Sequence, residues 1–410
     1  MKQKIIWCSD SSDIPTGYTN QTIYILRSLS QKYQTYLLGH QYLGSEKQAT
    51  TPLGLEPFIQ LPGNYEGMTI SYYIDRIRPQ IVAWLCDAFM VSWIKNKKKE
   101  WISKGNPKTL FYFPLDSDDI YEGMEETLSS IDYLVAMSWF GHNKLKKEIG
   151  LDSTIIPHCT DTNIFYPLTQ EQKDTIKKDA GFENKFVIGC IGRNQSRKNP
   201  QRLLYILKEF CDSHPDVIGF FHMDPYDPMQ ISGGKVNMFT HAKEIGLNDH
   251  LYPQKGCPKC HLFFTGFPFY SGIPQPQLNS VYNSFDVHAM STTGEGFGIT
   301  TIEAMACGVP SVVTDYTTTQ ELLVDNGRCG EPVKWDTFIC GGYNTKRVLP
   351  SEDEFLKKLD KLYNNELLRK QYSQIGREKA LKYYSLQAVM PQWSQLINEI
   401  LEKEELKCLV

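Results

Sequence analysis

The stretch TGEGFGITTIEAMACGVP, Thr293–Pro310, indicates more about this chain than any other part of the sequence. Glycine recurs at alternate positions of its first part, at Gly294, Gly296 and Gly298. Such spacing indicates a backbone turn that another molecule approaches closely. The residues that follow favour a helix, and Gly308 with Pro310 predicts its end.

Two glutamates, Glu295 and Glu303, lie on either side of this transition from turn to helix. We expect Glu295 on the turn and Glu303 about one turn into the helix. Unpaired amides at the start of a helix attract an anion. The stretch therefore predicts a phosphate-bearing ligand that two carboxylates hold through its hydroxyl groups.

Composition limits the class of protein. The chain has 410 residues, which suits two domains better than one core. A hydrophobic content of 41% and a charged content of 22% are those of a globular protein. The net charge of −4 makes nucleic acid an unfavoured partner, and no apolar run reaches the length of a membrane span. Eleven scattered cysteines and no secretory leader predict reduced thiols and a cytoplasmic location.

Short apolar runs alternate with helical patterns along most of the chain, which predicts parallel sheets covered by helices. The first series of predicted strands is KIIWCS, TYLLGH, QIVAWLCD, TLFYFP, YLVAMS and TIIPHC, and the second is KFVIGCIG, VIGFFHMD, HLFFTG, DVHAMST and PSVVTD. A polar linker is plausible near Asp161–Asp174, and the tail from about Pro350 has a helical pattern. We expect two Rossmann-like halves with ligands at the carboxyl ends of their strands.

Each half opens with a strand followed by a turn of small residues. The first turn contains Gly17, and the second, GRNQSRKNP, begins with Gly192 and Arg193 and includes Lys198. Arg193 offers two parallel donors to phosphate oxygens, and Lys198 adds a point charge. Alone, these cations are better interpreted as part of a solvated loop. The Glu295–Glu303 stretch in the same half reverses this preference and favours a phosphate site.

GRNQSRKNP and GEGFGITTIEAMACGVPSVVTD resemble the donor-site signature of retaining glycosyltransferase family 4, part of the glycosyl transferases group 1, which has the GT-B fold. IPHCTDTNIF resembles the family's junction between domains, and PTGYTNQT its N-terminal glycine loop. The resemblance implies an α/β protein of two Rossmann-like domains that face a central cleft, with the last helix crossing back to the N-terminal domain. The implied domains are an acceptor-binding domain over residues 1–168, completed by about 386–410, and a donor-binding domain over 169–385.

The resemblance also implies a role for each matching residue. Arg193 and Lys198 would hold the diphosphate of a nucleotide-sugar, Glu295 would contact the transferred sugar, and Glu303 would bind the ribose hydroxyls. The remaining implied donor-binding residues are Gly17, Gly192, Gly296, Phe297, Gly298, Ile299 and Thr300.

The implied reaction transfers a hexose from a UDP- or GDP-sugar, of the UDP-glucose or GDP-mannose type, with retention of configuration. It needs no cofactor or metal, because cationic side chains stabilise the departing diphosphate. Where the family has a histidine or an acidic residue facing the sugar, this sequence has FPLD, so Asp116 joins Arg193, Lys198 and Glu295 as a candidate catalytic residue. A helix cap or a solvated turn is an equal alternative for Asp116.

Two further groups of residues have weaker signals. His158 and Asp161 lie in the junction motif, where a structural histidine is at least as good an interpretation as a ligand-binding one. Cys257 and Cys260 have the spacing of zinc ligands, with His261 beside them. A closed zinc site needs more ligands than this segment offers, so the interpretation without zinc is preferred.

Partners other than the nucleotide-sugar are open at this level. The acceptor is a glycan, a lipid or a protein. The basic run IKNKKKEW, Ile94–Trp101, suggests peripheral contact with an anionic membrane, although its short length favours a solvated helix end. The alternatives to a transferase are a non-catalytic protein that binds nucleotide-sugars or glycans and, less favoured, a glycan phosphorylase, which would need a lysine-bound pyridoxal phosphate.

Overall fold

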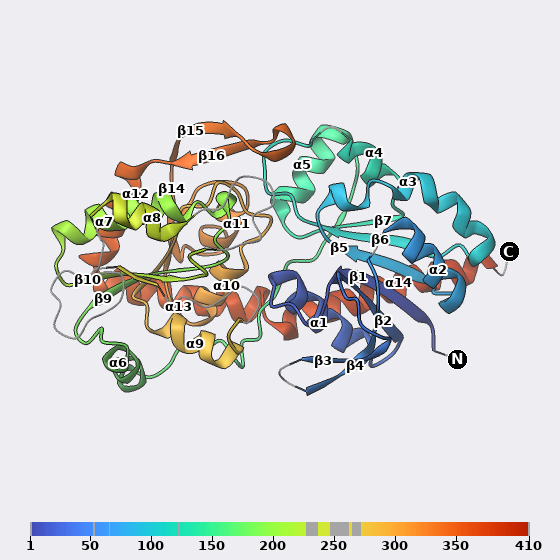
Figure 1. Ribbon diagram of the computed structural model, residues 1–410, viewed down its shortest axis with the longest axis horizontal. Helices are drawn as coiled ribbons and strands as arrows, with labels where there is room; N and C mark the ends of the chain where they lie inside the picture. Colours follow the sequence, from blue (N-terminus) through green and yellow to red (C-terminus); the bar gives the residue numbers. More distant parts are fainter. Residues whose placement is uncertain are drawn as a thin grey trace. The chain divides into compact units, whose positions relative to one another are not determined.

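The computed structural model describes residues 2–51, 54–64, 66–121, 123–226, 237–246, 262–264 and 272–408. The chain divides into two compact units. Unit 1 comprises Met1–Cys159 with Leu386–Val410, and unit 2 comprises Thr160–Ser385. Each unit is an α/β assembly around its own, mainly parallel sheet (Figure 1).

Unit 1 is built on a sheet with the strand order β3-β4-β2-β1-β5-β6-β7-β8. Only the pairing of β3 with β4 is antiparallel among the described strands of this sheet. The strands are β1 (Lys4–Asp10), β2 (Gln34–His40), β3 (Lys47–Thr51), β4 (Gly54–Leu61), β5 (Ile81–Leu85), β6 (Lys108–Phe113), β7 (Tyr133–Ala136) and β8 (Thr154–Ile155). All residues of β5 are buried, because helices cover both faces of a parallel sheet.

The helices of unit 1 include the last helix of the chain. They are α1 (Gly17–Leu29), α2 (Gly67–Ile77), α3 (Ile94–Lys97), α4 (Met124–Ser129), α5 (Trp139–Ile149) and α14 (Leu386–Cys408), with 3₁₀ turns at Ala88–Val91 and Lys98–Lys104. Helix α14 packs against α1, so the chain returns to unit 1 as the family resemblance implied (Figure 1). Trp393 of α14 contacts Trp7 and Tyr112 edge-on, with ring centroids 5.4 and 4.8 Å apart. Trp7 belongs to β1 and Tyr112 to β6, so Trp393 packs α14 against the sheet of unit 1.

Unit 2 is built on a parallel sheet with the order β11-β10-β9-β12-β13-β14, and a separate antiparallel pair, β15 with β16. The strands are β9 (Phe186–Ile191), β10 (Val217–His222), β11 (Leu262–Phe264), β12 (Val287–Met290), β13 (Ser311–Thr314), β14 (Gly330–Val333), β15 (Trp335–Cys340) and β16 (Lys346–Pro350). The helices are α6 (Gln170–Asp179), α7 (Pro200–Ser213), α8 (Met238–Glu244), α9 (Gln275–Asn283), α10 (Ile299–Ala306), α11 (Thr319–Leu323), α12 (Glu352–Tyr363) and α13 (Glu366–Tyr383), with 3₁₀ turns at Ser196–Lys198 and Gly342–Asn344.

The division between the units comes earlier than the sequence suggested, after Cys159 rather than after residue 168. The Thr160 amide donates to the carbonyl oxygen of Tyr384 at 2.8 Å. The Arg377 guanidinium of α13 donates to the Phe165 carbonyl at 2.7 Å. These bonds attach the junction segment to unit 2.

The polar stretch Asp161–Asp174 is not a linker throughout, because α6 begins inside it. The side chain of Thr169 accepts from the Gln172 amide, and the Gln172 side chain accepts from the Thr169 amide in return. This reciprocal capping box satisfies two amides at the helix start. The stretch therefore combines a short extended segment with the first turn of a helix.

Candidate functional site

Thr293–Pro310 forms the turn after β12 and the whole of α10. Gly298 is the N-cap residue of α10 and has a φ of 110°, a conformation that favours glycine. A Cβ there would also meet the side chain of Leu322 at 3.0 Å. At the other end, Gly308 has a φ of 69° and follows the C-cap, so the predicted end of the helix is confirmed.

Two cations from the turn after β9 hold the carboxylate of Glu295. Lys198 Nζ lies 2.6 Å from Glu295 Oε1, and Arg197 Nη1 lies 3.1 Å from Oε2. Arg197 also donates to the Gly294 carbonyl oxygen at 2.5 Å. The structure thus joins the two segments that the sequence identified separately. It adds Arg197, which the sequence analysis missed although it lies next to Lys198.

The electrostatics of this cluster follow from burial and from the two cations. Burial raises the pKa of Glu295, but the charges of Lys198 and Arg197 outweigh it and bring the pKa down to about 2. Glu295 is therefore ionised at neutral pH. Two cations and one carboxylate leave one net positive charge beside the first amides of α10, where an anion binds most favourably.

Glu303 lies in α10 in an almost uncharged environment. Its Oε2 accepts a hydrogen bond of 2.6 Å from the hydroxyl of Tyr282 in α9, and both residues are buried. Burial raises the pKa of Glu303 to about 7, although the hydrogen bond from Tyr282 lowers it. Tyr282 is a second residue that sequence reasoning missed, because nothing in its local pattern distinguishes it from a core aromatic.

The segment after β13 fixes the backbone of the turn. The Thr317 hydroxyl donates to the Glu295 carbonyl oxygen at 2.8 Å. The Glu295 amide in turn donates to the Thr317 hydroxyl oxygen at 3.1 Å. The Thr318 hydroxyl donates to the Phe297 carbonyl oxygen at 2.6 Å. Thr317 has a φ of 55°, which is rare for a β-branched residue and costs energy. Such strain persists where surrounding structure requires it, and here it places the hydroxyl between two groups of Glu295.

The remaining predicted donor residues of unit 2 lie in the same two turns and in the first positions of α10. Gly192 and Arg193 follow β9 directly, and Arg193 is half-buried. The ion pairs of Glu295, however, come from Arg197 and Lys198 and not from the predicted Arg193. The other residues of the turn and of the first positions of α10 are Gly296, Phe297, Ile299 and Thr300; Phe297 is buried and the other three are half-buried.

The predicted residues of unit 1 occupy strand ends and helix starts. Gly17 is the exposed first residue of α1, whose N-cap is Thr16. Asp116 is half-buried and follows the end of β6. Nearby Asp118 pairs with Lys144 at 2.7 Å.

His158 behaves as a structural histidine in its own unit. It is buried, its Nδ1 lies 2.7 Å from the hydroxyl of Tyr112, and burial lowers its pKa to about 3. Asp161 belongs to unit 2, where its Oδ1 accepts from the Asn163 amide at 3.0 Å in a local turn. The structure favours the structural interpretation of both residues.

The structure describes the basic run Ile94–Trp101 but not the cysteine segment that was considered as a zinc site. Three lysines of the basic run are paired: Lys95 with Glu126, Lys97 with Glu100 at 2.9 Å and Lys98 with Asp132 at 2.7 Å. This pairing reduces the attraction of the run for an anionic surface. Cys257, Cys260 and His261 lie outside the described residues, so the zinc alternative stays untested.

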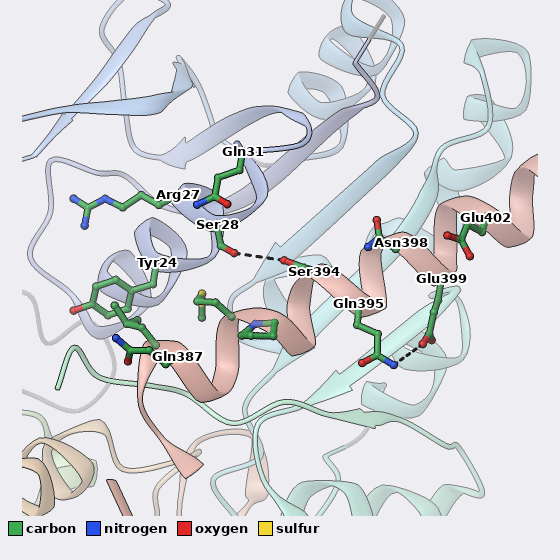
Figure 2. Close-up of a pocket in the computed structure, with 13 residues that line it drawn as sticks. Tyr24, Arg27, Ser28, Gln31, Gln387, Ser394, Gln395, Asn398, Glu399 and Glu402 are labelled. Atoms are coloured by element: carbon green, nitrogen blue, oxygen red, sulfur yellow. Dashed lines mark hydrogen bonds between the residues drawn. The ribbon is translucent and has the colours of Figure 1, made fainter. Parts of the chain in front are cut away.

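A hollow of about 890 Å³ lies in unit 1 between α1 and α14 (Figure 2). It contains none of the predicted donor residues. Most of the described residues that line it carry amide, hydroxyl or carboxylate groups, and the cation among them, Arg27, pairs with Glu56 at 2.5 Å. A diphosphate needs unneutralised donors, so the hollow does not suit the phosphate site.

Comparison with known proteins concerns the part of unit 2 that contains Glu295 and Glu303. Residues 265–379 match the family model described as "Glycosyl transferases group 1". A D-inositol 3-phosphate glycosyltransferase of Corynebacterium jeikeium is 29% identical over 188 residues, 44% of this chain and 41% of that protein. Mannosylfructose-phosphate synthase of Agrobacterium fabrum is 26% identical over 193 residues, 45% of this chain and 38% of that protein. The alignments thus span less than half of each relative, and they confirm the resemblance to group 1 glycosyltransferases.

Solved structures extend the likeness to the whole fold. Sucrose-phosphate synthase of Thermosynechococcus elongatus has a TM-score of 0.74 at 14% identity, covering 98% of this chain and all of that one (100%). HepE of Anabaena in complex with UDP has a TM-score of 0.68 at 13% identity, covering 97% and 100%. These likenesses confirm the predicted GT-B fold, whereas membership of family 4 within the group stays a prediction.

Proposed function

We propose that the chain is a glycosyltransferase that moves a hexose from a nucleotide-sugar to an acceptor hydroxyl, retaining the anomeric configuration and requiring no metal. The observation that carries this proposal is the contact of Glu295 with Lys198 and Arg197 at the start of α10, with Glu303 one turn further. A phosphate flanked by two hydroxyl-binding carboxylates needs such an arrangement.

The charges of the cluster suit the departing group. Cleavage of the sugar–phosphate bond places negative charge on the diphosphate and leaves an oxocarbenium-like sugar. Lys198, Arg197 and Arg193 would stabilise that charge together with the first amides of α10. Preorganised donors of this kind are the largest catalytic contribution in comparable sites. In the protein without ligand, Glu295 holds two of these cations in position.

Each carboxylate has a distinct proposed role. Glu295, ionised and at the turn, would accept hydrogen bonds from hydroxyls of the transferred sugar. Glu303, deeper in the unit, would accept hydrogen bonds from the ribose hydroxyls in its ionised form. The ribose hydroxyls would then donate hydrogen bonds to the buried Glu303 carboxylate, and Tyr282 would keep that carboxylate oriented.

For the transfer step, the departing phosphate oxygen would take the proton of the acceptor hydroxyl as the new bond forms on the same face of the sugar. The rival is a pair of carboxylates flanking the bond, one of them a nucleophile, as in retaining glycosidases. Asp116 of unit 1 is the residue we propose to face the sugar. Unit 1 would bind the acceptor, which is a glycan, a lipid or a protein.

Several observations support the choice of donor and location. HepE of Anabaena has been crystallised with UDP and with UDP-glucose, so we propose a UDP-hexose as the first donor to test and a GDP-hexose as the second. A cytoplasmic location agrees with the cysteines, since those that the structure describes are free thiols. Among the described residues, no helix combines the length and the apolar character that a membrane crossing requires.

Thermal unfolding of the full chain against UDP-, GDP-, ADP- and TDP-sugars tests the donor site. A ligand that binds only the folded protein raises the unfolding midpoint according to its affinity. We expect one nucleotide series to raise the midpoint and the shift to shrink in Glu303→Ala. Glu366→Ala, at an exposed position of α13 in the same unit, is the matched control and should leave the shift unchanged.

Turnover then separates the transferase from its alternatives. Incubation with the identified donor and an acceptor library, followed by NMR of the product, should give a glycoside with the donor's anomeric configuration. An inverted product would contradict the retaining mechanism. Donor binding without any transfer would favour the non-catalytic binding protein, and phosphate-dependent cleavage of a glycan would favour a phosphorylase.

A further inference from the structure

An exposed antiparallel hairpin, β15 with β16 and the turn between them, stands apart from the main sheet of unit 2 (Figure 1). All residues of β15 are exposed. They include Trp335, Phe338 and Ile339, and the turn adds Tyr343; Phe338 is 61% and Tyr343 60% exposed. Large apolar residues concentrated in one short exposed segment, unlike singly scattered ones, indicate an interaction site.

The hairpin also carries an excess of positive charge. Residues 334–347 contain three basic residues, Lys334, Lys346 and Arg347, and one acidic residue, Asp336. Lys346 Nζ lies 5.2 Å from the ring centroid of Phe338 and 5.7 Å from that of Trp335. Cations among aromatic rings suit a surface that offers both negative charge and an apolar interior.

The base of the hairpin is bound to the donor turn. The Val348 amide donates to the Thr293 carbonyl oxygen at 3.3 Å, and the Tyr316 hydroxyl donates to the Lys346 carbonyl oxygen at 2.8 Å. Thr293 immediately precedes the Gly294–Glu295 turn, and Tyr316 precedes Thr317, which holds the Glu295 backbone. The base of the hairpin is therefore held against the turn that carries Glu295, the residue proposed to contact the transferred sugar.

We propose that this hairpin, residues 334–347, docks unit 2 onto an anionic lipid surface. Trp and Tyr are enriched where protein meets the headgroup layer, and nearby lysine and arginine add attraction to anionic lipids. Resting on the proposed function, the acceptor is a membrane-borne molecule with a free hydroxyl.

Edge-to-edge pairing with a second copy of the chain fits the hairpin less well. The register of β15 against β16 shifts between Trp335 and Thr337. A bulge of this kind twists an edge strand and discourages it from pairing with another. The net positive charge of the hairpin would also repel an identical hairpin. The basic run Ile94–Trp101 is a weaker membrane candidate, since three of its lysines already have acidic partners.

The test is sedimentation of the full chain with vesicles of phosphatidylcholine alone and of phosphatidylcholine mixed with phosphatidylglycerol. We expect binding to the mixed vesicles, weakening as salt rises. Phe338→Ser with Ile339→Ser should lower the affinity by about tenfold or more, since each buries apolar surface in the membrane. Lys334→Glu should lower it and reduce its salt dependence. Leu367→Ser is the control, because Leu367 is 79% exposed on α13 of the same unit.

Nucleotide-induced thermal shifts measured on the same variants keep the two proposals apart. A normal shift in Phe338→Ser/Ile339→Ser shows that the fold and the donor site are intact. No vesicle binding by the native chain, with a normal shift, overturns the membrane proposal and leaves the donor site standing. Vesicle binding without any nucleotide-induced shift would support the membrane proposal and overturn the donor site. A hairpin-dependent dimer in solution without vesicle binding would overturn the proposal in favour of a second copy.

Discussion

The hydroxyl of Thr317 lies between the amide and the carbonyl oxygen of Glu295, at 3.1 and 2.8 Å. One side chain thus fixes both hydrogen-bonding groups of the residue whose carboxylate holds Lys198 and Arg197. Thr317 does so from a backbone conformation with a φ of 55°. The position of the Glu295 carboxylate therefore depends on a residue from a different part of the chain.

Replacing Thr317 by valine should weaken donor binding more than replacing it by serine. Valine keeps the shape but leaves the Glu295 amide and carbonyl without their partner, whereas serine keeps the hydroxyl. A lost hydrogen bond costs about 1 kcal/mol, so we expect roughly a fivefold rise in the dissociation constant for Thr317→Val. Titration calorimetry with the donor identified by thermal shift measures both variants. Equal affinities for serine and valine would show that the hydroxyl does not position Glu295.

Removal of either cation on Glu295 should lower turnover more than donor affinity. Lys198→Met and Arg197→Met each remove a cation that we propose stabilises the departing diphosphate, and we expect kcat to fall by about 10²–10³-fold. Steady-state kinetics with the identified donor and acceptor give kcat and KM separately. Lys208→Met, which removes a half-buried lysine of α7 that pairs with Asp212 in the same unit, should behave as the native chain. An unchanged kcat in Arg197→Met would restrict the role of Arg197 to orienting Glu295.

Binding of the intact nucleotide-sugar should strengthen as pH rises through about 7. Burial raises the pKa of Glu303 to about 7, so its carboxyl group is protonated below this value and accepts ribose hydrogen bonds poorly. Affinity measured between about pH 6 and about pH 8 should show this step, and Glu303→Gln should bind weakly at every pH without it. A step of the same size in Glu303→Gln would assign the titration to another group.

The same pKa shift has an opposite effect on the stability of the unliganded protein. The ordinary pKa of Glu303 is 4.5 and the folded value is about 7, so the folded state binds more protons between these values. The stabilising contribution of this group is present below about pH 4.5 and is lost as pH rises through about 7. Denaturant unfolding across this range should therefore show a steeper loss of stability in the native chain than in Glu303→Gln.

Substitution of Gly189 by alanine should destabilise unit 2 through packing alone. A Cβ on this residue of β9 would lie 2.1 Å from the ring of Phe285. Overpacking of this kind costs about 1–3 kcal/mol. Phe285→Leu, which vacates the space, should make the additional cost of Gly189→Ala smaller, as a double-mutant cycle of unfolding free energies would show. Additive losses would mean that the strand moves instead of the ring.

Much of the fold could be predicted from local patterns. Buried parallel strands such as β5 and β9 read as continuous apolar runs, because helices cover both faces. The hairpin of β15 and β16 was missed, since its exposed apolar residues face no core and give no periodic signal. Helix α6 was read as part of a linker although Thr169 and Gln172 carry the spacing of a capping box.

Three features could be predicted from the sequence by itself: the glycine turn with a glutamate on either side of the helix start, the cationic turn after β9, and the alternation of strands and helices. Each of these depends on residues that lie close together in the chain. Only the tertiary structure decided that Arg197 shares Glu295 with Lys198, that Tyr282 donates to Glu303 and that Thr317 holds the Glu295 backbone. The contacts of Glu295 join segments about 20 to 100 residues apart, which meet because parallel strands bring their carboxyl ends to one edge of the sheet. The contact of Tyr282 with Glu303 instead joins helices α9 and α10. The pKa values of Glu295 and Glu303 differ for the same reason: burial is common to both, but the cations reach only one.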